Sequence, residues 1–354
     1  MSLDDIRQRI DALDSEIIDL LIERAKTAEQ IGQLKADSGK NVYDPAREAA
    51  VLEALVSRDL GPLDEDTLKA IYRQVISACR SLQYPLKVSF LGPEYTFSHV
   101  AALNYFGVSS EFQATPSIED TFNVVERGTA DFGIVPIENS IQGVEARTLD
   151  CLFETDLSIC TETYVPVHLQ LVANCSMDAI RTVHSHPQPL AQCRRWLRTN
   201  LPKADLVNEA STAAAAAKVA GKDDAAAIAT QEAAEAHGLK TLASNIEDQP
   251  NNRTRFFVIG REESTPTGND KTSVIFTTEH RAGALYRALA PFSAHNLNLT
   301  LIQSRPMPGA VHGPYYFYVD FLGHAETVEV NEAIKDLREH CAFVKILGSY
   351  SVSD

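Results

Sequence analysis

The hydrophobic pattern of this chain changes its period near residue 85, and this change constrains the fold more than any other feature. Before it, apolar residues from Leu3 to Leu20 recur at alternating intervals of three and four, as on one face of a long helix. After it, residues 87–91 alternate with a period of two, which is typical of a strand. The chain therefore begins with an all-helical domain and continues with domains that contain sheets.

The N-terminal segment carries cations on and beside its apolar seam. Three helices are predicted, spanning about residues 3–36, 45–56 and 65–83, and Asp44 is a plausible N-cap of the second. Arg24 lies on the seam of the first helix, whereas Arg7 and Lys35 border it. Such a cation either extends to water or binds an anion between helices. Because the segment is too thin to form a large core alone, we expect it to dimerise.

The polar residues of this segment resemble, in order and spacing, those of the all-helical chorismate mutases, which are intertwined dimers. The matching set is Arg7, Arg24, Lys35, Asp44, Arg47, Glu48 and Gln83, with Cys79 at the usual small polar position one turn before Gln83. The resemblance implies that Arg24 and Lys35 hold the carboxylates and the ether oxygen of chorismate. Glu48 would bind the hydroxyl, Gln83 the ether oxygen, and Arg7 would reach into the partner's site. A pericyclic rearrangement fits this set, since it needs charge stabilisation and positioning but no nucleophile.

The middle of the chain alternates strands with helices, which predicts an α/β domain. Several strand ends carry hydroxyl, amide or carboxyl side chains where a helix begins. They are Thr96 and Ser98, Glu138-Asn139-Ser140, Ser185 with Gln192 in the helix that follows, and Ser211-Thr212. Helix N-termini of this kind hold carboxylates through free N–H groups and the helix dipole. Ordinary helix capping is the alternative at each single position.

A turn-rich run meets a buried strand at Asn251-Asn252-Arg253-Thr254-Arg255-Phe256. Strand alternation places Thr254 and Phe256 on one face and Arg255 on the other. A hydroxyl and a guanidinium at such a junction suit an anionic ligand. The alternative is a strand start with a solvated arginine.

Residues 86–262 resemble prephenate dehydratases, in which two α/β subdomains, like those of periplasmic binding proteins, clamp prephenate in a cleft. The matching segments are Gly-Pro-x-x-Thr-Phe-Ser, Glu-Asn-Ser-x-x-Gly, Thr-Leu-Asp, Ser-His-Pro-Gln, Ser-Thr-x-x-Ala and Asn-Asn-x-Thr-Arg-Phe. The resemblance implies that Thr254 assists departure of the C4 hydroxyl and that loss of CO₂ aromatises the ring, without a metal or cofactor. Substrate-binding residues would be Thr96, Ser98, Glu138, Asn139, Ser140, Ser185, Gln192, Ser211, Thr212, Arg255 and Phe256, with Glu138 and His186 as further candidate proton donors.

This segment departs from the family pattern at two places. Tyr95 replaces the glycine of Gly-Pro-x-Gly-Thr, and a left-handed backbone there would cost tyrosine on the order of 1 kcal/mol. Residues 144–147 place Glu145 and Arg147 beside the expected cleft, where the family usually has an asparagine. Two alternatives remain: a prephenate decarboxylase that retains the hydroxyl, and a non-catalytic ligand sensor.

Residues 271–354 have the predicted order βαββαβ, which is that of an α+β ferredoxin-like sandwich. Gly283-Ala284-Leu285 and Gln303-Ser304-Arg305 resemble the effector-binding segments of the ACT domain, which follows prephenate dehydratases and senses phenylalanine at a dimer interface. Gln303 stands where the family usually has glutamate, so the effector's ammonium would lose a charged partner. The alternative is a dimerisation module without a ligand.

The net charge of -16 argues against nucleic acid or an anionic membrane as a partner. Six scattered cysteines and an N-terminus without an apolar signal-peptide core predict free thiols in the cytoplasm. As a whole the chain resembles the bifunctional chorismate mutase/prephenate dehydratases with a C-terminal ACT domain. The resemblance implies domains at 1–84, 86–262 and 271–354, the substrates chorismate and prephenate, L-phenylalanine as effector, and a homodimer or higher homo-oligomer.

Overall fold

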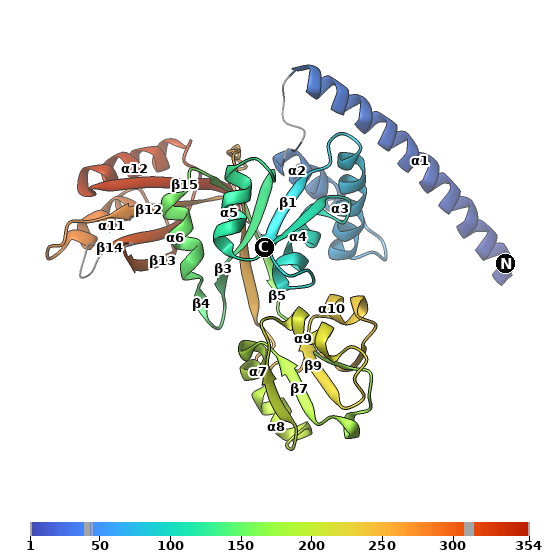
Figure 1. Ribbon diagram of the computed structural model, residues 1–354. Coiled ribbons are helices and arrows are strands. Elements are labelled where there is room, and N and C mark those ends of the chain that lie inside the picture. The colour runs from blue at the N-terminus through green and yellow to red at the C-terminus, as the bar shows by residue number, and fades with distance from the viewer. Residues whose placement is uncertain (1, 39–42, 44, 308–314, 353–354) are drawn as a thin grey trace. The chain divides into compact units, whose positions relative to one another are not determined.

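The computed structural model describes residues 2–38, 43, 45–307 and 315–352, and Figure 1 labels most of its elements. It divides into two compact units. The first, called the helical unit, comprises Met1–Lys87 and Leu103–Glu111, and the second, called the sheet unit, comprises Val88–Ala102 and Phe112–Asp354. Among the described residues, no helix has the length and the apolar run needed to cross a membrane.

The helical unit contains α1 (Leu3–Ser38), α2 (Pro45–Val56) and α3 (Glu65–Ser81), within two residues of the predicted bounds. Asp64 caps α3, since its Oδ1 accepts a hydrogen bond from the Thr67 amide at 2.8 Å. Gly32 allows α1 to approach the end of α3, because a Cβ at this position would lie 2.9 Å from the Cβ of Gln83. The apolar seam in the N-terminal half of α1 is exposed in this single chain, with Ile10 52% and Leu20 65% exposed.

The first sheet of the sheet unit has the order β2-β1-β3-β11-β5, with β4 paired to β3. Its strands are β1 (Lys87–Leu91), β2 (Glu111–Thr115), β3 (Phe132–Asn139), β4 (Gly143–Val144), β5 (Ser158–Pro166) and β11 (Arg253–Gly260). The helices of this part are α4 (Phe97–Phe106), α5 (Ile118–Glu126) and α6 (Ala146–Glu154). β11 runs antiparallel to both β3 and β5, so a strand from much later in the chain lies inside this sheet.

The second sheet has the order β10-β6-β9-β7-β8. Its strands are β6 (Gln170–Ala173), β7 (Thr182–Ser185), β8 (Asp205–Asn208), β9 (Ala225–Ala229) and β10 (Lys240–Ala243). Its helices are η1 (Met177–Ala179), α7 (Pro187–Gln192), α8 (Arg194–Asn200), α9 (Thr212–Val219) and α10 (Gln231–Ala236). The chain crosses between the two sheets after β5 and again before β11, which confirms the expected pair of subdomains. Strand β9 consists of four alanines and one isoleucine, and all five residues are buried beneath neighbouring elements. Small side chains allow this close packing.

The C-terminal part contains β12 (Asp270–Thr277), α11 (Ala284–Ala294), β13 (Leu299–Pro306), β14 (Tyr315–Leu322), α12 (Val328–His340) and β15 (Phe343–Ser351). Its antiparallel sheet has the order β13-β14-β12-β15, and the predicted ferredoxin-like order βαββαβ is confirmed. Both helices contribute to one apolar core with this sheet, in which Phe292 of α11 and Leu337 of α12 are buried.

A second core joins the C-terminal sheet to the first subdomain. Phe257 of β11 and Tyr350 of β15 belong to the same buried cluster, with ring centroids 5.9 Å apart. Gly348 of β15 permits this packing, because a Cβ there would collide with the backbone of Ile159 in β5. Residues 261–269, between β11 and β12, therefore connect two parts that share a core.

Two candidate active sites

A cavity of about 610 Å³ lies among α1, α2 and α3 of the helical unit. Its lining contains the predicted residues Arg24, Lys35, Arg47, Glu48, Cys79 and Gln83. Arg24, Ile31 and Lys35 share one face of α1 because a helix repeats every 3.6 residues. The cations that interrupt the apolar seam therefore face a cavity of the size expected for a small ligand.

Arg80 of α3 also lines this cavity and holds the carboxylate of Glu48. Its Nη1 lies 2.7 Å from one carboxylate oxygen of Glu48 and 2.8 Å from the other, while its Nη2 donates to the Phe106 carbonyl at 2.5 Å. Burial of Arg80 strengthens this charge-assisted contact. The sequence analysis missed Arg80, although it lies between Cys79 and Gln83, two residues of the predicted set that line the same cavity.

Arg7, one of the predicted mutase residues, does not line the cavity. It lies near the start of α1, exposed, with its Nη1 3.8 Å from Asp4, and the 17 residue steps from it to Arg24 span roughly 25 Å of helix. Asp44 lies outside the residues that the structure describes. One chain thus brings together six of the eight positions of the predicted set.

A second cavity, of about 620 Å³, lies in the sheet unit and is called the cleft. Both subdomains contribute to it. Its lining contains the predicted residues Thr96, Ser98, Glu138, Asn139, Gln192, Ser211, Thr212, Thr254 and Phe256, together with Glu145 and His186. No arginine or lysine is among the described lining residues.

The ends of β3 and β11 form the polar centre of the cleft. Their register places Thr254 opposite Asn139, and Asn139 Nδ2 donates to Thr254 Oγ1 at 3.0 Å and to Asn252 Oδ1 at 2.9 Å. Ser140 Oγ donates to the same oxygen of Asn252 at 3.2 Å. Because Thr254 Oγ1 accepts from Asn139, its own proton is available to a ligand in the cleft. The sequence analysis did not assign Asn252 a role, although it precedes Thr254 by two residues within the Asn-Asn-x-Thr-Arg-Phe segment.

Three predicted substrate-binding residues do not line the cleft, and the structure corrects their assignment. Ser185 is fully buried and its hydroxyl donates to the Ile228 carbonyl at 2.7 Å. Ser140 is used to hold Asn252 and the Arg253 amide, the latter at 3.0 Å. Arg255 is buried on the opposite face of β11, as strand alternation predicted, and its guanidinium contacts other protein groups.

The helix starts that line the cleft are formed by local capping. Ser211 Oγ accepts from the Ala214 amide at 3.0 Å and so begins α9, while Thr96 Oγ1 donates to the Leu91 and Pro93 carbonyls at 3.1 and 3.0 Å. Capping and cleft lining thus coincide at Ser211. The single hydroxyl proton of Thr96 is shared between these two carbonyls and so serves the loop itself.

The departures from the family pattern have clear structural consequences. Tyr95 has a φ of 65°, in the left-handed region that the sequence comparison implied. Its amide donates to His99 Nδ1 at 2.9 Å, and burial lowers the pKa of His99, which keeps this nitrogen an acceptor. Glu145 caps its own helix by accepting from the Arg147 amide at 3.2 Å, whereas the Arg147 guanidinium forms an ion pair with Glu119 and does not line the cleft.

The predicted effector residues lie in two segments of the C-terminal part. Gly283 precedes α11 with a φ of 75°, and Ala284 and Leu285 open that helix. Gln303, Ser304 and Arg305 lie on β13, a strand at the edge of the sheet.

Arg305 also contacts the first subdomain. Its Nη2 donates to Asp150 of α6 at 2.6 Å, and this hydrogen bond raises the pKa of Arg305. Tyr316 Oη donates to the same carboxylate at 2.7 Å. An effector-motif residue is therefore joined to the helix whose first residue, Ala146, lines the cleft.

Comparison with known proteins assigns each part of the chain to a family. Family models match at residues 6–84 (chorismate mutase type II), 88–264 (prephenate dehydratase) and 272–339 (ACT domain). These matches define a multidomain enzyme of aromatic amino-acid biosynthesis.

Whole-chain relatives carry the same domains. The bifunctional chorismate mutase/prephenate dehydratase of Aquifex aeolicus (strain VF5) is 42% identical over 353 residues, covering 98% of this chain and 97% of that protein. The protein of the same name from Neisseria gonorrhoeae is 41% identical over 348 residues, covering 97% and 95%. Prephenate dehydratase from Arthrobacter aurescens, solved in complex with L-Phe, superposes with a TM-score of 0.70 at 34% identity, covering 75% of this chain and 90% of that one. The chain belongs to the family of bifunctional chorismate mutase/prephenate dehydratases.

Proposed function

We propose that this chain rearranges chorismate to prephenate in the helical cavity and converts prephenate to phenylpyruvate in the cleft. L-phenylalanine binding to the ACT domain would inhibit the pathway at this enzyme. The observation that carries the proposal is the presence of two cavities in one chain, each lined by most of the polar residues predicted for it. The functional domains would span 1–84, 86–262 and 271–354.

The helical cavity suits a reaction without covalent catalysis. Arg24 and Lys35 would bind the carboxylates of chorismate and stabilise negative charge on the ether oxygen as the C–O bond breaks. Glu48, held in place by Arg80, would accept a hydrogen bond from the substrate hydroxyl, and Gln83 would donate a hydrogen bond to the ether oxygen. Holding the reactive conformer supplies the rest of the rate enhancement.

A second copy of the chain would complete this site. The exposed apolar residues of α1, among them Ile10 and Leu20, need a partner surface, and a second α1 is the natural one. Arg7, roughly 25 Å from Arg24 along the helix, would then enter the partner's cavity. We therefore propose a homodimer, and the free cysteines support a reducing cytoplasm as its location.

The cleft suits elimination from an anionic ring. The Thr254 hydroxyl would donate its proton toward the C4 hydroxyl of prephenate, which leaves as water while the ring carboxylate leaves as CO₂. The electron pair of the broken C–C bond enters the ring and makes it aromatic. Asn139 and Gln192 would orient the substrate; Gln192 Nε2 is buried without a hydrogen-bond partner among the described residues. The N-terminus of α9 at Ser211 and Thr212 would bind a carboxylate.

Supplying chorismate to the purified full-length chain tests both assignments. Phenylpyruvate, followed by mass and ultraviolet absorbance, is the expected product. Prephenate alone would reduce the cleft to a ligand-binding domain, and a non-aromatic product that lacks only CO₂ would make it a decarboxylase. An Arg24→Ala variant should lose chorismate consumption and keep prephenate turnover, whereas wild-type consumption of chorismate would contradict the placement of the first site.

A further inference from the structure

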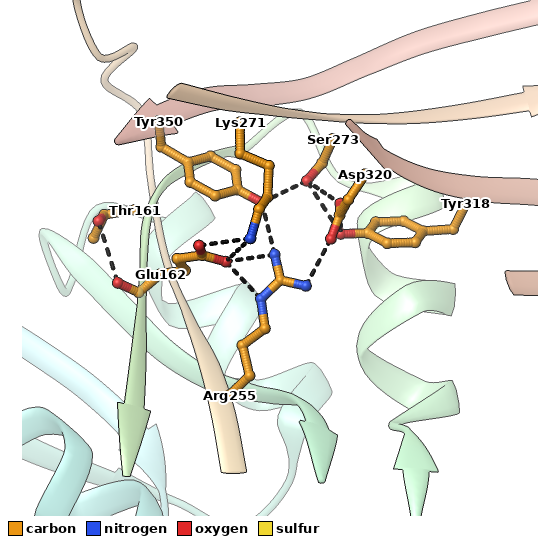
Figure 2. A network of polar contacts seen from close by, with 8 residues as sticks. All are labelled: Thr161, Glu162, Arg255, Lys271, Ser273, Tyr318, Asp320 and Tyr350. Atoms are coloured by element: carbon orange, nitrogen blue, oxygen red, sulfur yellow. Dashed lines mark hydrogen bonds and ion pairs between the residues drawn. The ribbon is translucent and has the colours of Figure 1, made fainter. Parts of the chain in front are cut away.

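A network of buried charged and hydroxyl groups joins the first subdomain to the C-terminal sheet, and we call it the interface network (Figure 2). Its members are Glu162 on β5, Arg255 on β11, Lys271 and Ser273 on β12, Tyr318 and Asp320 on β14, and Tyr350 on β15. The side chains of Glu162 and Asp320 are 0% exposed and that of Arg255 is 4% exposed. Charges this deeply buried require compensation inside the network.

Arg255 lies at the centre of the network and bridges the two parts. Its Nε and Nη2 contact Glu162 Oε2 at 2.6 and 2.5 Å, and its Nη1 donates to Asp320 Oδ2 at 2.6 Å. One carboxylate comes from the dehydratase sheet and the other from the C-terminal sheet. A guanidinium can hold both carboxylates at once because it is planar and has several N–H donors.

The hydrogen bonds around Asp320 close into a ring. Arg255 Nη2 donates to Tyr350 Oη at 3.1 Å, and Ser273 Oγ donates to Asp320 Oδ1 at 2.6 Å. Tyr350 then donates to Ser273 at 2.6 Å, because the serine proton is already used. Burial alone would lower the pKa of Arg255, but its interactions with Tyr350, Asp320 and Glu162 outweigh that effect and raise the pKa. The guanidinium therefore remains charged and ordered.

The charges of the network balance. Lys271 Nζ lies 2.7 and 3.0 Å from the two oxygens of Glu162, so two cations face two carboxylates. Removing one member leaves a buried charge without a complete partner set, which is costly at such depth. Arg255 is thus held more rigidly than a surface side chain on the same strand.

This rigidity occurs next to an irregularity in the pairing of β11 with β3. One step along β11, from Arg255 to Phe256, corresponds to two steps along β3, from Glu138 to Pro136. Such a bulge interrupts the ladder and re-aims the neighbouring side chains. Thr254, immediately before the bulge, therefore lacks a regular continuation of the ladder on the β3 side, while on its other side it pairs in register with Val165 of β5.

We propose that Arg255 is a positioning residue for Thr254, and that the docked C-terminal sheet, through Asp320, holds β11 in the geometry that dehydration needs. The inference rests on the function proposed for the cleft. It assigns to the C-terminal domain a role in basal turnover, in addition to effector binding.

A purely structural role for the network makes a different prediction. Lys345 of β15 is a matched control, since its Nζ also crosses this interface, donating to the Leu152 carbonyl at 3.0 Å and the Phe153 carbonyl at 3.3 Å on α6. It contacts no residue of β11 through these bonds. If buried cations only hold the two parts together, Lys345→Met and Arg255→Met should have the same consequences.

The test measures kcat and KM for prephenate with the full-length chain, together with its melting temperature. We expect Arg255→Met to lower kcat about 100-fold, as a displacement of about 1 Å would, with KM within about threefold. Lys345→Met should lower the melting temperature but leave kcat unchanged. The described contacts of Asp320 include no cleft residue, so loss of its charge can reach the cleft only through Arg255. Asp320→Asn should therefore lower kcat about tenfold.

Two further variants keep the test decisive if Arg255→Met folds poorly. Arg255→Lys retains the charge and should recover part of kcat, because a single ammonium cannot hold both carboxylates in one plane. The double variant Arg255→Met with Asp320→Asn leaves Glu162 paired with Lys271. Its kcat should equal that of Arg255→Met alone, because the effects of substitutions at two residues in direct contact do not add. Equal kcat for the Asp320→Asn variant and the wild type would overturn the proposal.

The mutase reaction separates this inference from the function on which it rests. Chorismate consumption occurs in the helical unit and should stay at the wild-type rate in every variant that folds. If wild-type protein fails to turn over prephenate, the proposed function of the cleft fails. If the wild type is active and Arg255→Met behaves like Lys345→Met, only the positioning role fails.

Discussion

The two cavities of this chain have nearly equal volumes, about 610 and 620 Å³, but opposite chemical linings. The helical cavity presents four cations, Arg24, Lys35, Arg47 and Arg80, against Glu23 and Glu48. The described lining of the cleft contains hydroxyls, amides, a histidine and the carboxylates of Glu138 and Glu145, with no lysine or arginine. Yet both are proposed to bind the same dianion, prephenate, once as product and once as substrate.

The difference follows from the reactions. A pericyclic rearrangement moves no proton, so fixed full charges stabilise its transition state directly. An elimination must deliver a proton to the leaving hydroxyl while an electron pair moves from the ring carboxylate into the ring. A neighbouring ammonium or guanidinium would stabilise the negative charge on that carboxylate and so oppose this movement. Neutral donors and helix N-termini hold the carboxylates without a full positive charge. Four variants or conditions test this contrast.

The largest effect is expected for Thr254→Val, which keeps the shape of the side chain and removes its proton. We expect kcat for prephenate to fall about 10³-fold, the scale of a lost general acid, with chorismate consumption unchanged. Thr199→Val, on the exposed face of α8, is the control. Wild-type phenylpyruvate production by the Thr254 variant would remove this residue from the mechanism.

The next effect concerns the cation that the sequence analysis missed. Arg80→Met removes the two hydrogen bonds that Arg80 donates to Glu48, and we expect kcat/KM for chorismate to fall about 10²-fold while prephenate turnover persists. Arg73→Met removes an exposed arginine from the same helix and should change neither reaction. If Arg80→Met lowers stability but leaves the mutase kinetics unchanged, Arg80 has only a structural role in packing α3.

Ionic strength should separate the sites by a smaller factor. Raising salt from about 0.05 to 0.5 M shortens the screening length several-fold and weakens binding between full charges. The ratio of KM for chorismate to KM for prephenate should therefore rise a few-fold. The ratio cancels the repulsion that the net charge of -16 exerts on both substrates. An unchanged ratio would mean that the cations of the helical cavity contribute little to substrate binding.

The smallest effect is a pH dependence of stability through His99. Because burial lowers its pKa, the folded chain takes up a proton at lower pH than the unfolded chain does. The stability from neutral His99 is complete above the ordinary pKa of about 6.5 and is lost as pH falls through the lowered value. The melting temperature of the wild type should thus fall relative to His99→Asn between pH 7.5 and 5. A constant difference would contradict the assignment.

The sequence predicted the periodic features of this molecule well. Helix and strand bounds and the shared face of Thr254 and Phe256 both depend on local spacing. Alternation also placed Arg255 on the far face of β11. It could not show what covers that face.

The missed or corrected residues depend on contacts between distant parts of the chain. Arg255 meets Glu162 and Asp320, which are 93 and 65 positions away in the sequence. Ser185 resembled a helix-start ligand, but its hydroxyl meets the Ile228 carbonyl on a neighbouring strand. Spacing within one element shows which way a side chain leaves the backbone, whereas its partner is set by how the sheets assemble.

Tyr95 has a consequence for how the cleft opens. Its carbonyl accepts a hydrogen bond from Thr230 of the second subdomain at 3.1 Å, while its amide is held by His99 of the first. Tyr95 therefore joins the two subdomains beside the crossing strands, and a rotation that separates them here must break the Thr230 hydrogen bond. Because a left-handed backbone costs tyrosine more than glycine, the hydrogen bonds at its amide and carbonyl hold this residue in place. Opening the cleft at this point then costs one hydrogen bond, about 1 kcal/mol.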